Sequence, residues 1–146
     1  MIIGPASAND APAIAAIHLQ ARRAAMPYLR QVHSDAATHA WFAATVSLPP
    51  QCWWVARHDD QVVGYLRLEG ELIDHLYVRP DWQRQGVGSR LLAKARALSP
   101  DRLRLNTFQR NTAARAFYEG HDFRAVGQTV GLNEENEPDV QYVWQR

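Results

Sequence analysis

The sequence has little that would mark a secreted, membrane-spanning or nucleic-acid-binding protein. Its 146 residues include one cysteine, Cys52, which can form no internal disulfide, so a reducing compartment such as the cytoplasm is the expected location. No run approaches the roughly 18 apolar residues that a membrane helix needs, and no segment has the pattern of a signal peptide. A formal net charge of +1 is too small to indicate binding to nucleic acid or to a membrane surface.

Common nucleotide and metal motifs are also missing. The P-loop pattern Gly-x-x-x-x-Gly-Lys-Ser/Thr does not occur. The dinucleotide pattern Gly-x-Gly-x-x-Gly fails because Leu91 stands where the third glycine is needed. His18, His39, His58 and His121 do not have metal-ligand spacing, so we expect no metal.

The residues that are present predict one α/β domain spanning 1–146. Hydrophobic residues make up 47% and charged residues 21%, as in globular proteins. Helical periodicity indicates helices from about residue 10 to 26, 35–46, 87–98 and 111–119. β-type runs occur at 1–4, 52–57, 61–70, 71–78, 102–107, 123–131 and 140–145. This order indicates helices packed around a single sheet.

A glycine pair stands where an apolar run gives way to a helical run, in the segment QRQGVG, residues 83–88. A helix N-terminus carries unpaired N–H groups and a partial positive charge, and it binds phosphates readily. Glycine lets a ligand approach those N–H groups because it has no Cβ, and Arg84 can add a charge-assisted contact. The alternative is a glycine-rich turn with no ligand.

Two motifs resemble the GNAT N-acetyltransferase superfamily. VRPDWQRQGVGSRLL is similar to its motif A, Gln/Arg-x-x-Gly-x-Gly/Ala, with Gln83, Gly86 and Gly88 at the defined positions. NTAARAFYEGHDF resembles its second motif, Asn-x-x-Ala-x-x-Phe-Tyr-Glu-x-x-Gly-Phe, through Asn111, Ala114, Phe117, Tyr118, Glu119 and Phe123. Asp122 replaces the motif's glycine, and Asp tolerates the left-handed turn expected there. The opening segment is also similar to the family's first helix, although Gly4 stands in place of its usual arginine.

The resemblance implies an α+β GNAT fold and an acetyl-CoA site. The fold has a central mixed, largely antiparallel sheet of about six to seven strands with four helices, and its fourth strand splays from the fifth. In such a fold the pantetheine arm lies in the gap and the pyrophosphate lies on the N–H groups of 84–89. The residues implied in cofactor binding are Leu76, Tyr77, Val78, Gln83, Arg84, Gln85, Gly86, Val87, Gly88, Ser89, Asn111, Ala114 and Phe117. Phe117 could equally be core packing, and Asn111 only a helix cap.

The chemistry implied by the resemblance is direct attack of an amine on the thioester, without a covalent enzyme intermediate. The N–H of Val78 would polarise the acetyl oxygen, and Tyr118 would donate a proton to the leaving thiolate, unless it is a structural tyrosine. Candidates for the base are Asp74, His75 and Glu71 on or near the fourth strand. Since side chains alternate along a strand, only some of these can face the acceptor.

The acceptor is expected to be a small-molecule amine or a peptide N-terminus. An alkylamine needs about 4.6 kcal/mol to become neutral at pH 7 and an α-amine only about 1 kcal/mol. We expect 26–33 and 133–139 to border the acceptor pocket. The second segment contains Glu134, Glu135, Glu137 and Asp139, which could attract a cation or simply form a solvated loop.

Two other functions are considered. A CoA-binding regulatory module without turnover would keep the phosphate loop but lose the catalytic half, and the presence of Tyr118 favours an enzyme. A nucleic-acid module would use the basic residues Arg84, Arg90, Lys94 and Arg96, against which the low net charge argues. We also expect a homodimer, because 139–146 would form an exposed sheet edge in a monomer.

Overall fold

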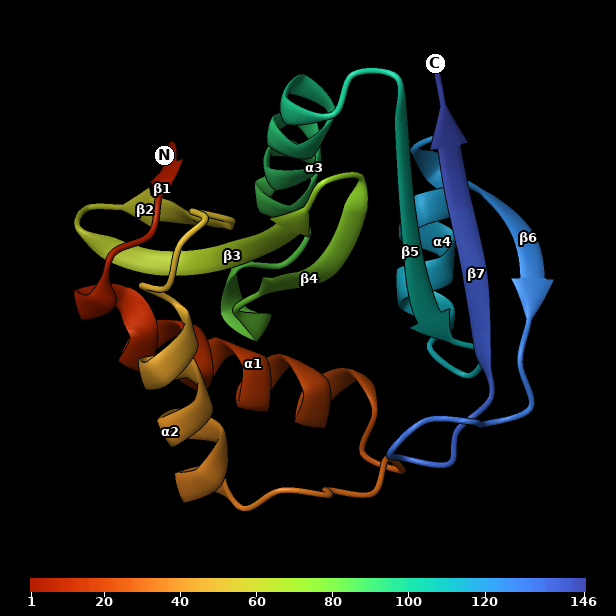
Figure 1. Cartoon of the computed structure of the whole chain (residues 1–146), viewed down its shortest axis with the longest axis horizontal. Coiled ribbons are helices and arrows are strands. Elements are labelled where there is room, and N and C mark those ends of the chain that lie inside the picture. Colours follow the sequence, from red (N-terminus) through yellow and green to blue (C-terminus); the bar gives the residue numbers. More distant parts are fainter.

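The structure, a computed structural model of residues 1–146, contains one seven-stranded sheet in the order β1-β2-β3-β4-β5-β7-β6 (Figure 1). The strands are β1 (Ile2–Pro5), β2 (Trp53–His58), β3 (Gln61–Glu69), β4 (Leu72–Val78), β5 (Arg102–Phe108), β6 (Arg124–Gln128) and β7 (Asp139–Gln145). The helices are α1 (Ala11–Ala25), α2 (Asp35–Thr45), α3 (Val87–Leu98) and α4 (Thr112–Gly120), with short 3-10 turns at Ala8–Asp10 and Pro80–Trp82. The seven strands and four helices confirm the predicted elements.

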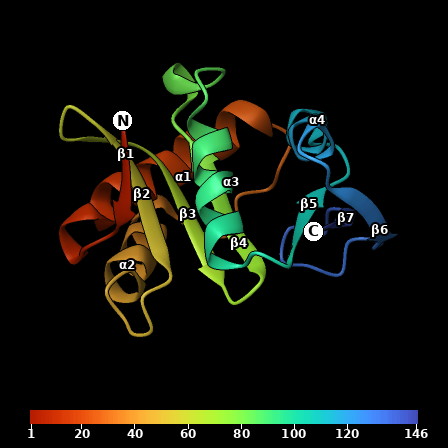
Figure 2. The same ribbon diagram turned by 90° about the horizontal axis from the view of Figure 1, so that it is seen from above.

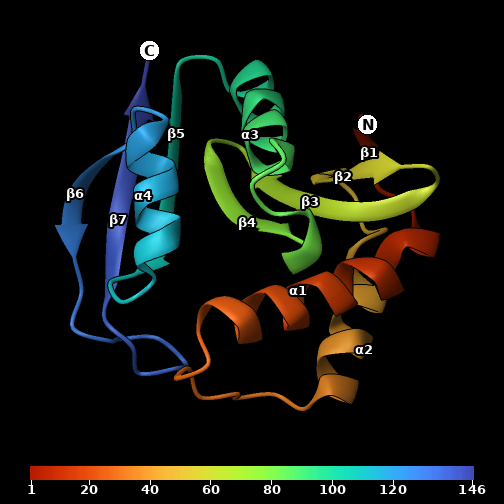
Figure 3. The same ribbon diagram turned by 180° about the vertical axis from the view of Figure 1, so that it is seen from behind.

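The helices bury two separate cores on the sheet. Side chains of α1 and α2 pack with one set of strand residues, among them Trp53 and Tyr65. Side chains of α3 and α4 pack with another set that includes Leu66 and Tyr142. Seen from behind, α3 lies over β4 while α4 lies over β5 and β7 (Figure 3). None of these helices combines the length and apolar character needed to cross a bilayer.

Strands β4 and β5 diverge after a single pairing. Leu72 pairs with Arg104 in parallel orientation, and no other residues of the two strands pair. All other neighbours in the sheet are antiparallel. Figures 1 and 2 show the two halves of the sheet separated at this point, with α3 and α4 on either side of the divergence in the view from above. The predicted mixed GNAT sheet, splayed between the fourth and fifth strands, is therefore confirmed.

Strand β4 contains one extra residue at Asp74. His75 lies opposite Arg67 of β3, but Ile73 lies opposite Leu68, so Asp74 has no partner of its own in the register. A bulge of this kind interrupts the simple alternation of side chains that we expected along this strand. It lets Ile73 join the core of α3 although His75 packs on the side of α1 and α2.

The end of the chain is not the exposed edge that we expected. Strand β7 pairs with β5 on one side and β6 on the other, so β6 forms the edge. The prediction was wrong because the chain reaches the edge first and then returns, placing its last strand inside the sheet. The turn after α4 is as predicted: Asp122 adopts a left-handed conformation, with φ of 69°.

Candidate functional site

The divergence of β4 and β5 opens a cleft of about 460 Å³. Its walls are β4, the end of β5, the first turn of α3 and one face of α4, and the last turn of α1 closes one side. Of the predicted site residues, those lining the cleft are Asp74, Leu76, Tyr77, Val78, Gln83, Arg84, Gly86, Gly88, Ser89, Asn111, Ala114, Phe117 and Tyr118. The fold thus brings two sequence motifs and one strand to the same cavity.

The two glycines of the QRQGVG segment have different tasks at the N-terminus of α3. Gly86 is the residue before the helix and has a φ of 82°, which favours glycine. No atom lies within 4 Å of the place where a Cβ on Gly86 would stand, so its backbone faces open space. A Cβ on Gly88 would instead lie 3.2 Å from the Phe117 ring, so this glycine lets α3 and α4 approach.

The first turn of α3 presents free N–H groups to the cleft. Arg90 N–H donates to the Gly86 carbonyl over 3.1 Å, and the N–H groups that precede Arg90 in the helix have no helical acceptor. Arg84 lines the cleft next to this turn and forms no ion pair, whereas the nearby Arg79 pairs with Asp81. A dianionic group would therefore meet unpaired N–H donors, the positive end of a helix and a free guanidinium.

The edge of β4 toward β5 supplies further backbone groups. Arg79 N–H donates to the Val63 carbonyl of β3, 2.9 Å away. Because hydrogen bonds alternate along an antiparallel pair, Leu76 and Val78 then turn their N–H and C=O groups away from β3 and toward the cleft. An extended amide chain lying in the cleft could pair with this edge as a strand would.

Tyr118 on α4 lines the cleft with a nearly buried side chain. Its ring packs on Phe117, Phe123 and Tyr142, and its hydroxyl makes no hydrogen bond within the protein. Burial raises the pKa of Tyr118 well above its usual value of 10. The phenol therefore keeps its proton through the physiological pH range.

Four predicted site residues lie outside the cleft. Val87 is buried in the core, and the Gln85 side chain bonds to the Asp81 carbonyl. Glu71 pairs with two arginines near the far end of β5. His75 packs among aromatic rings from α2 and β2–β4. Asn111 lines the cleft and also caps α4, since its side chain accepts from Ala114 N–H at 3.2 Å.

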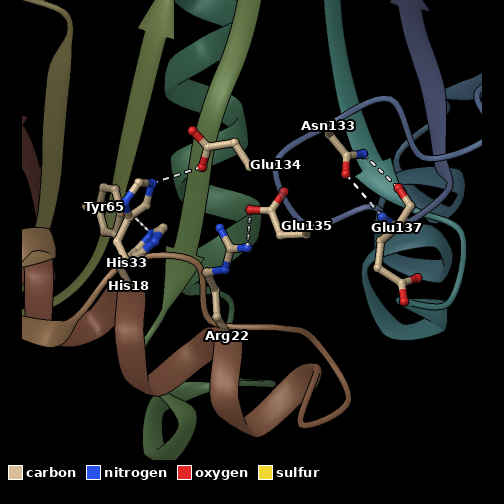
Figure 4. A network of polar contacts seen from close by, with 8 residues as sticks. All are labelled: His18, Arg22, His33, Tyr65, Asn133, Glu134, Glu135 and Glu137. Atoms are coloured by element: carbon tan, nitrogen blue, oxygen red, sulfur yellow. Dashed lines mark hydrogen bonds and ion pairs between the residues drawn. The ribbon is translucent and has the colours of Figure 1, made fainter.

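A second cavity of about 230 Å³ lies beside the first, and Met26 lines both. It is formed by the last turns of α1, the loop that follows and Thr38 of α2, with Glu135 from the β6–β7 loop. Figure 4 shows how this loop is tied to α1 and to the loop after it: Arg22 pairs with Glu135 over 3.1 Å and His33 with Glu134 over 3.0 Å.

The acidic loop is not the unpaired anionic patch that its sequence indicates. Glu134 and Glu135 are paired as described, Glu137 pairs with Arg110, and Asp139 accepts a hydrogen bond from Thr129. Each carboxylate therefore has a partner, and the loop's field on an approaching cation is correspondingly weak. No group of three or more His, Cys, Asp or Glu side chains is arranged to hold a metal ion.

Sequence reasoning missed the polar contacts of His18 and Tyr65. His18 was considered only as a metal ligand, and Tyr65 as part of a strand. The structure joins them by a hydrogen bond of 3.0 Å between His18 Nδ1 and the Tyr65 hydroxyl, shown in Figure 4. The available signal was the helical spacing of His18 with Ile14 and Arg22, which places all three along one side of α1.

Comparisons with known proteins agree with this geometry. Residues 49–125 match the family described as Acetyltransferase (GNAT) domain. The peptidyl-lysine N-acetyltransferase YjaB of Salmonella typhimurium is 39% identical over 83 residues, which span 56% of this chain and 57% of that protein. The protein named Probable N-acetyltransferase Rv2775, from Mycobacterium tuberculosis, is 30% identical over 91% of this chain and 87% of its own length.

The solved structures give the same fold. The apo form of YjaB from Escherichia coli superimposes with a TM-score of 0.80 at 24% identity, covering 98% of this chain and 97% of that one. The family match covers more than half of the residues and includes both β4 and the helix that follows the glycine pair. The chain therefore belongs to the GNAT family of acetyltransferases.

Proposed function

We propose that the protein is an acetyl-CoA-dependent N-acetyltransferase that acts on a primary amine. The observation that carries the proposal is the cleft between β4 and β5, with free N–H groups at one end and Tyr118 inside it. This combination offers a binding site for a phosphorylated amide chain and a proton donor for a leaving group.

The residues present fit acetyl-CoA. The open space at Gly86, the unpaired N–H groups of the first turn of α3 and the free Arg84 suit a pyrophosphate. The cleft-facing edge of β4 at Leu76 and Val78 suits the two amides of a pantetheine arm, and Phe117 offers an apolar wall. When bound there, acetyl-CoA supplies an acetyl group activated as a thioester.

The protein's own groups would then act on the two ends of the transfer. The N–H of Val78 lies on the edge of β4 that faces the cleft and would donate to the acetyl oxygen as negative charge develops on it. The neutral Tyr118 hydroxyl has no protein acceptor, so it is free to donate its proton to the departing sulfur. Nucleophilic attack by the amine would form the amide directly.

The acceptor that we propose is a lysine side chain in a peptide, with other primary amines as further candidates. YjaB, which matches over little more than half of each chain, carries the name peptidyl-lysine N-acetyltransferase. The second cavity lies next to the cleft, since Met26 lines both, and this is where we place the lysine side chain. A peptide N-terminus would need less free energy to lose its proton at pH 7, and a small amine would need less space. Both would use the same cavity.

A binding module without turnover is the alternative, and thermal unfolding followed by an activity screen separates the two functions. A ligand present at 100 times its Kd adds about 2.7 kcal/mol to the free energy of unfolding. For a protein of about this size, each kcal/mol raises the midpoint temperature of unfolding by about 2–4 °C, so the expected shift is several degrees. We expect such a shift with acetyl-CoA and with CoA but not with NAD. Thiol release with a lysine peptide would then establish the enzyme. No shift at saturating acetyl-CoA would overturn the proposal, and binding without thiol release from any amine would favour the module.

We also propose that two copies associate through β6, because it is the exposed edge of the sheet. Val126 on this strand and Val130 and Leu132 just after it are exposed large apolar side chains. Pairing of two such edges would cover both the free backbone groups and this apolar surface.

A further inference from the structure

A chain of polar side chains crosses the otherwise aromatic interior beneath α1 and α2. His18 Nδ1 lies 3.0 Å from the Tyr65 hydroxyl, and that hydroxyl lies 2.9 Å from His75 Nδ1. The other ring nitrogen of His75, Nε2, lies 3.5 Å from Asp74 Oδ2. We call these four residues, His18, Tyr65, His75 and Asp74, the polar chain.

The carboxylate at one end favours one direction for the hydrogen bonds. Asp74 pairs with Arg67 at 2.7 Å, and its Oδ2 lies 3.5 Å from His75 Nε2, a contact that favours a proton on this ring nitrogen. His75 Nδ1 is then an acceptor, and the Tyr65 hydroxyl donates a hydrogen bond to it. The Tyr65 oxygen in turn accepts from His18 Nδ1–H, which leaves a lone pair on His18 Nε2.

The two ends of the polar chain lie in different cavities. His18 lines the second cavity, between α1 and the loop after it, and its Nε2 has no hydrogen-bond partner. Asp74 lines the cleft, where its side chain is 36% exposed. Tyr65 is fully buried between them. One end residue, His18, therefore borders the second cavity, and the other, Asp74, borders the cleft.

Burial keeps every interior member of the polar chain neutral. It lowers the pKa of His18 to about 3 and that of His75 to about 3, helped by Coulomb repulsion from neighbouring cations, and it raises the pKa of Tyr65. A stored imidazolium or phenolate is thus excluded at pH 7. A proton can cross only if each group gives one proton as it receives another, and the hydrogen-bond order just derived permits this.

We propose that the polar chain is a proton relay, in which His18 takes a proton from the acceptor's ammonium group and Asp74 receives one in the cleft. This inference rests on the proposed transferase function and adds the route by which the nucleophile becomes neutral. An alkylamine is almost entirely protonated at pH 7, with a pKa of about 10.4. The two cavities lie next to each other, since the buried Met26 lines both, and we place the ammonium group in the second cavity and the thioester in the cleft.

The relay balances in four concerted transfers. The N–H bond of the ammonium breaks as a proton binds His18 Nε2, and His18 Nδ1 gives its proton to the Tyr65 oxygen. The original Tyr65 proton moves to His75 Nδ1, and the proton on His75 Nε2 moves to Asp74. The amine keeps the electron pair needed for attack, and the partly exposed Asp74 releases its proton to water.

Several charged or titratable groups face the relay and affect its pH dependence. Arg22 of α1 acts on both histidines, and Glu135 of the β6–β7 loop pairs with that arginine. Tyr77 of β4 packs on the His18 ring, with centroids 5.2 Å apart. Arg67 of β3 faces His75 and Asp74. The groups from α2, Trp41 and Phe42, are aromatic and do not titrate.

The test uses His18→Asn, whose amide can still donate to Tyr65 but has no basic nitrogen. With an N-terminally blocked lysine peptide and saturating acetyl-CoA, we expect kcat/KM at pH 7 to fall about 100-fold. The free-amine fraction of lysine rises about 300-fold between pH 7 and 9.5, so we expect the deficit to shrink to a few-fold at pH 9.5. A merely structural effect would lower the rate equally at both pH values.

Tyr65→Phe interrupts the same relay at its centre and keeps the buried ring. We expect the same pH-dependent deficit from this variant and no further loss in the double variant with His18→Asn, because both changes break one pathway. The exposed His39 of α2 lies outside both cavities, so His39→Asn is the matched control and should behave as the wild type.

The outcomes distinguish the relay from the function on which it rests. A wild type that neither binds acetyl-CoA nor acetylates any amine overturns the proposed function. A wild type that acetylates the peptide, with variants that bind acetyl-CoA normally but lose activity equally at pH 7 and 9.5, overturns the relay alone. Additive losses in the double variant also overturn it. A pH-dependent, non-additive deficit supports it.

Discussion

The Tyr118 hydroxyl is positioned by its ring rather than by a hydrogen bond. The ring packs on three aromatic neighbours, and the oxygen has no partner in the protein. We therefore expect Tyr118→Phe to retain stability and acetyl-CoA affinity while kcat falls about 100-fold. Steady-state kinetics and a thermal unfolding curve measured on the same preparation check this. An unchanged kcat would assign Tyr118 to packing alone.

Gly88 and Gly120 make a matched pair of single-atom tests. A Cβ at Gly88 would lie 3.2 Å from the Phe117 ring, whereas a Cβ at Gly120 in α4 would meet nothing within 4 Å. We expect Gly88→Ala to displace Phe117 and cost about 1–3 kcal/mol of stability, as overpacking does, and to weaken acetyl-CoA binding.

Gly120→Ala should instead leave binding unchanged and stabilise by up to about 1 kcal/mol, because alanine favours a helix. Urea unfolding and titration with acetyl-CoA measure both effects. Equal behaviour of the two variants would contradict the contact between Gly88 and Phe117 as the cause.

At the residue scale, the features that could be predicted from the sequence are those that depend on neighbouring residues. Asn111 and Asp122 were predicted because a helix cap or a left-handed turn depends on a few neighbouring positions. The contact between His18 and Tyr65 was not, since it joins residues 47 positions apart. Only the packing of α1 on the sheet brings them together.

At the scale of the elements, an ion pair connects the turn before α1 to strand β2. Arg57 donates to Asp10 over 2.6 Å, and Ser7 N–H donates to the same carboxylate over 2.8 Å. Burial raises the pKa of Asp10, but these hydrogen bonds outweigh it and hold the pKa below its ordinary value of 3.8. The carboxylate therefore stabilises the fold above that pH and loses its effect as pH falls through the folded-state pKa.

We expect Asp10→Asn to lower the free energy of unfolding by about 2 kcal/mol at pH 7, the typical value for charged hydrogen bonds. The difference from the wild type should decrease below pH 4 as the native carboxyl becomes protonated. Urea unfolding at pH 7, 5 and 3.5 measures it. A difference that is constant over this range would show that the charge of Asp10 is not what stabilises the tie.

Predictions of whole elements succeeded where one period dominates and failed where two strands compete. The stripe of Leu91, Leu92 and Ala95 places α3 unambiguously. The bulge at Asp74 could not be predicted, because strict alternation is the only pattern that a strand sequence displays. The edge position of β6 depends on which late strand pairs with β5, and both late strands have suitable composition.

At the scale of the whole molecule, the two outer strands β1 and β6 differ in what they expose. We expect the protein to elute as a dimer and Val126→Arg to make it monomeric, because a charge at the β6 edge opposes pairing. Ile2→Arg at the opposite edge, where Ile2 is also exposed, should leave the dimer intact. Sedimentation velocity measures the oligomeric state of the wild type and of both variants. A monomeric wild type, or a dimer that only Ile2→Arg disrupts, would contradict the β6 interface.

The family and the layout of the sheet were predicted from two motifs in their expected order, and the family match and the sheet order confirm them. The pairing of the acidic loop could not be predicted, because its partners Arg22, His33 and Arg110 come from distant segments. They lie in α1, in the loop after α1 and in the turn between β5 and α4, and only the fold brings all three to the β6–β7 loop. Charge in a sequence indicates composition, and only the fold decides which charges remain free.

The single pairing between β4 and β5 also has a mechanical meaning. One residue pair, Leu72 with Arg104, joins two half-sheets that elsewhere share no ladder. An extended amide chain bound along β4 would act as a splice, supplying the strand that is missing from the middle of the sheet. The resistance of the two half-sheets to local unfolding would then depend on the concentration of the bound ligand. Amide hydrogen exchange near the splice should slow when acetyl-CoA is plentiful and quicken when it is scarce.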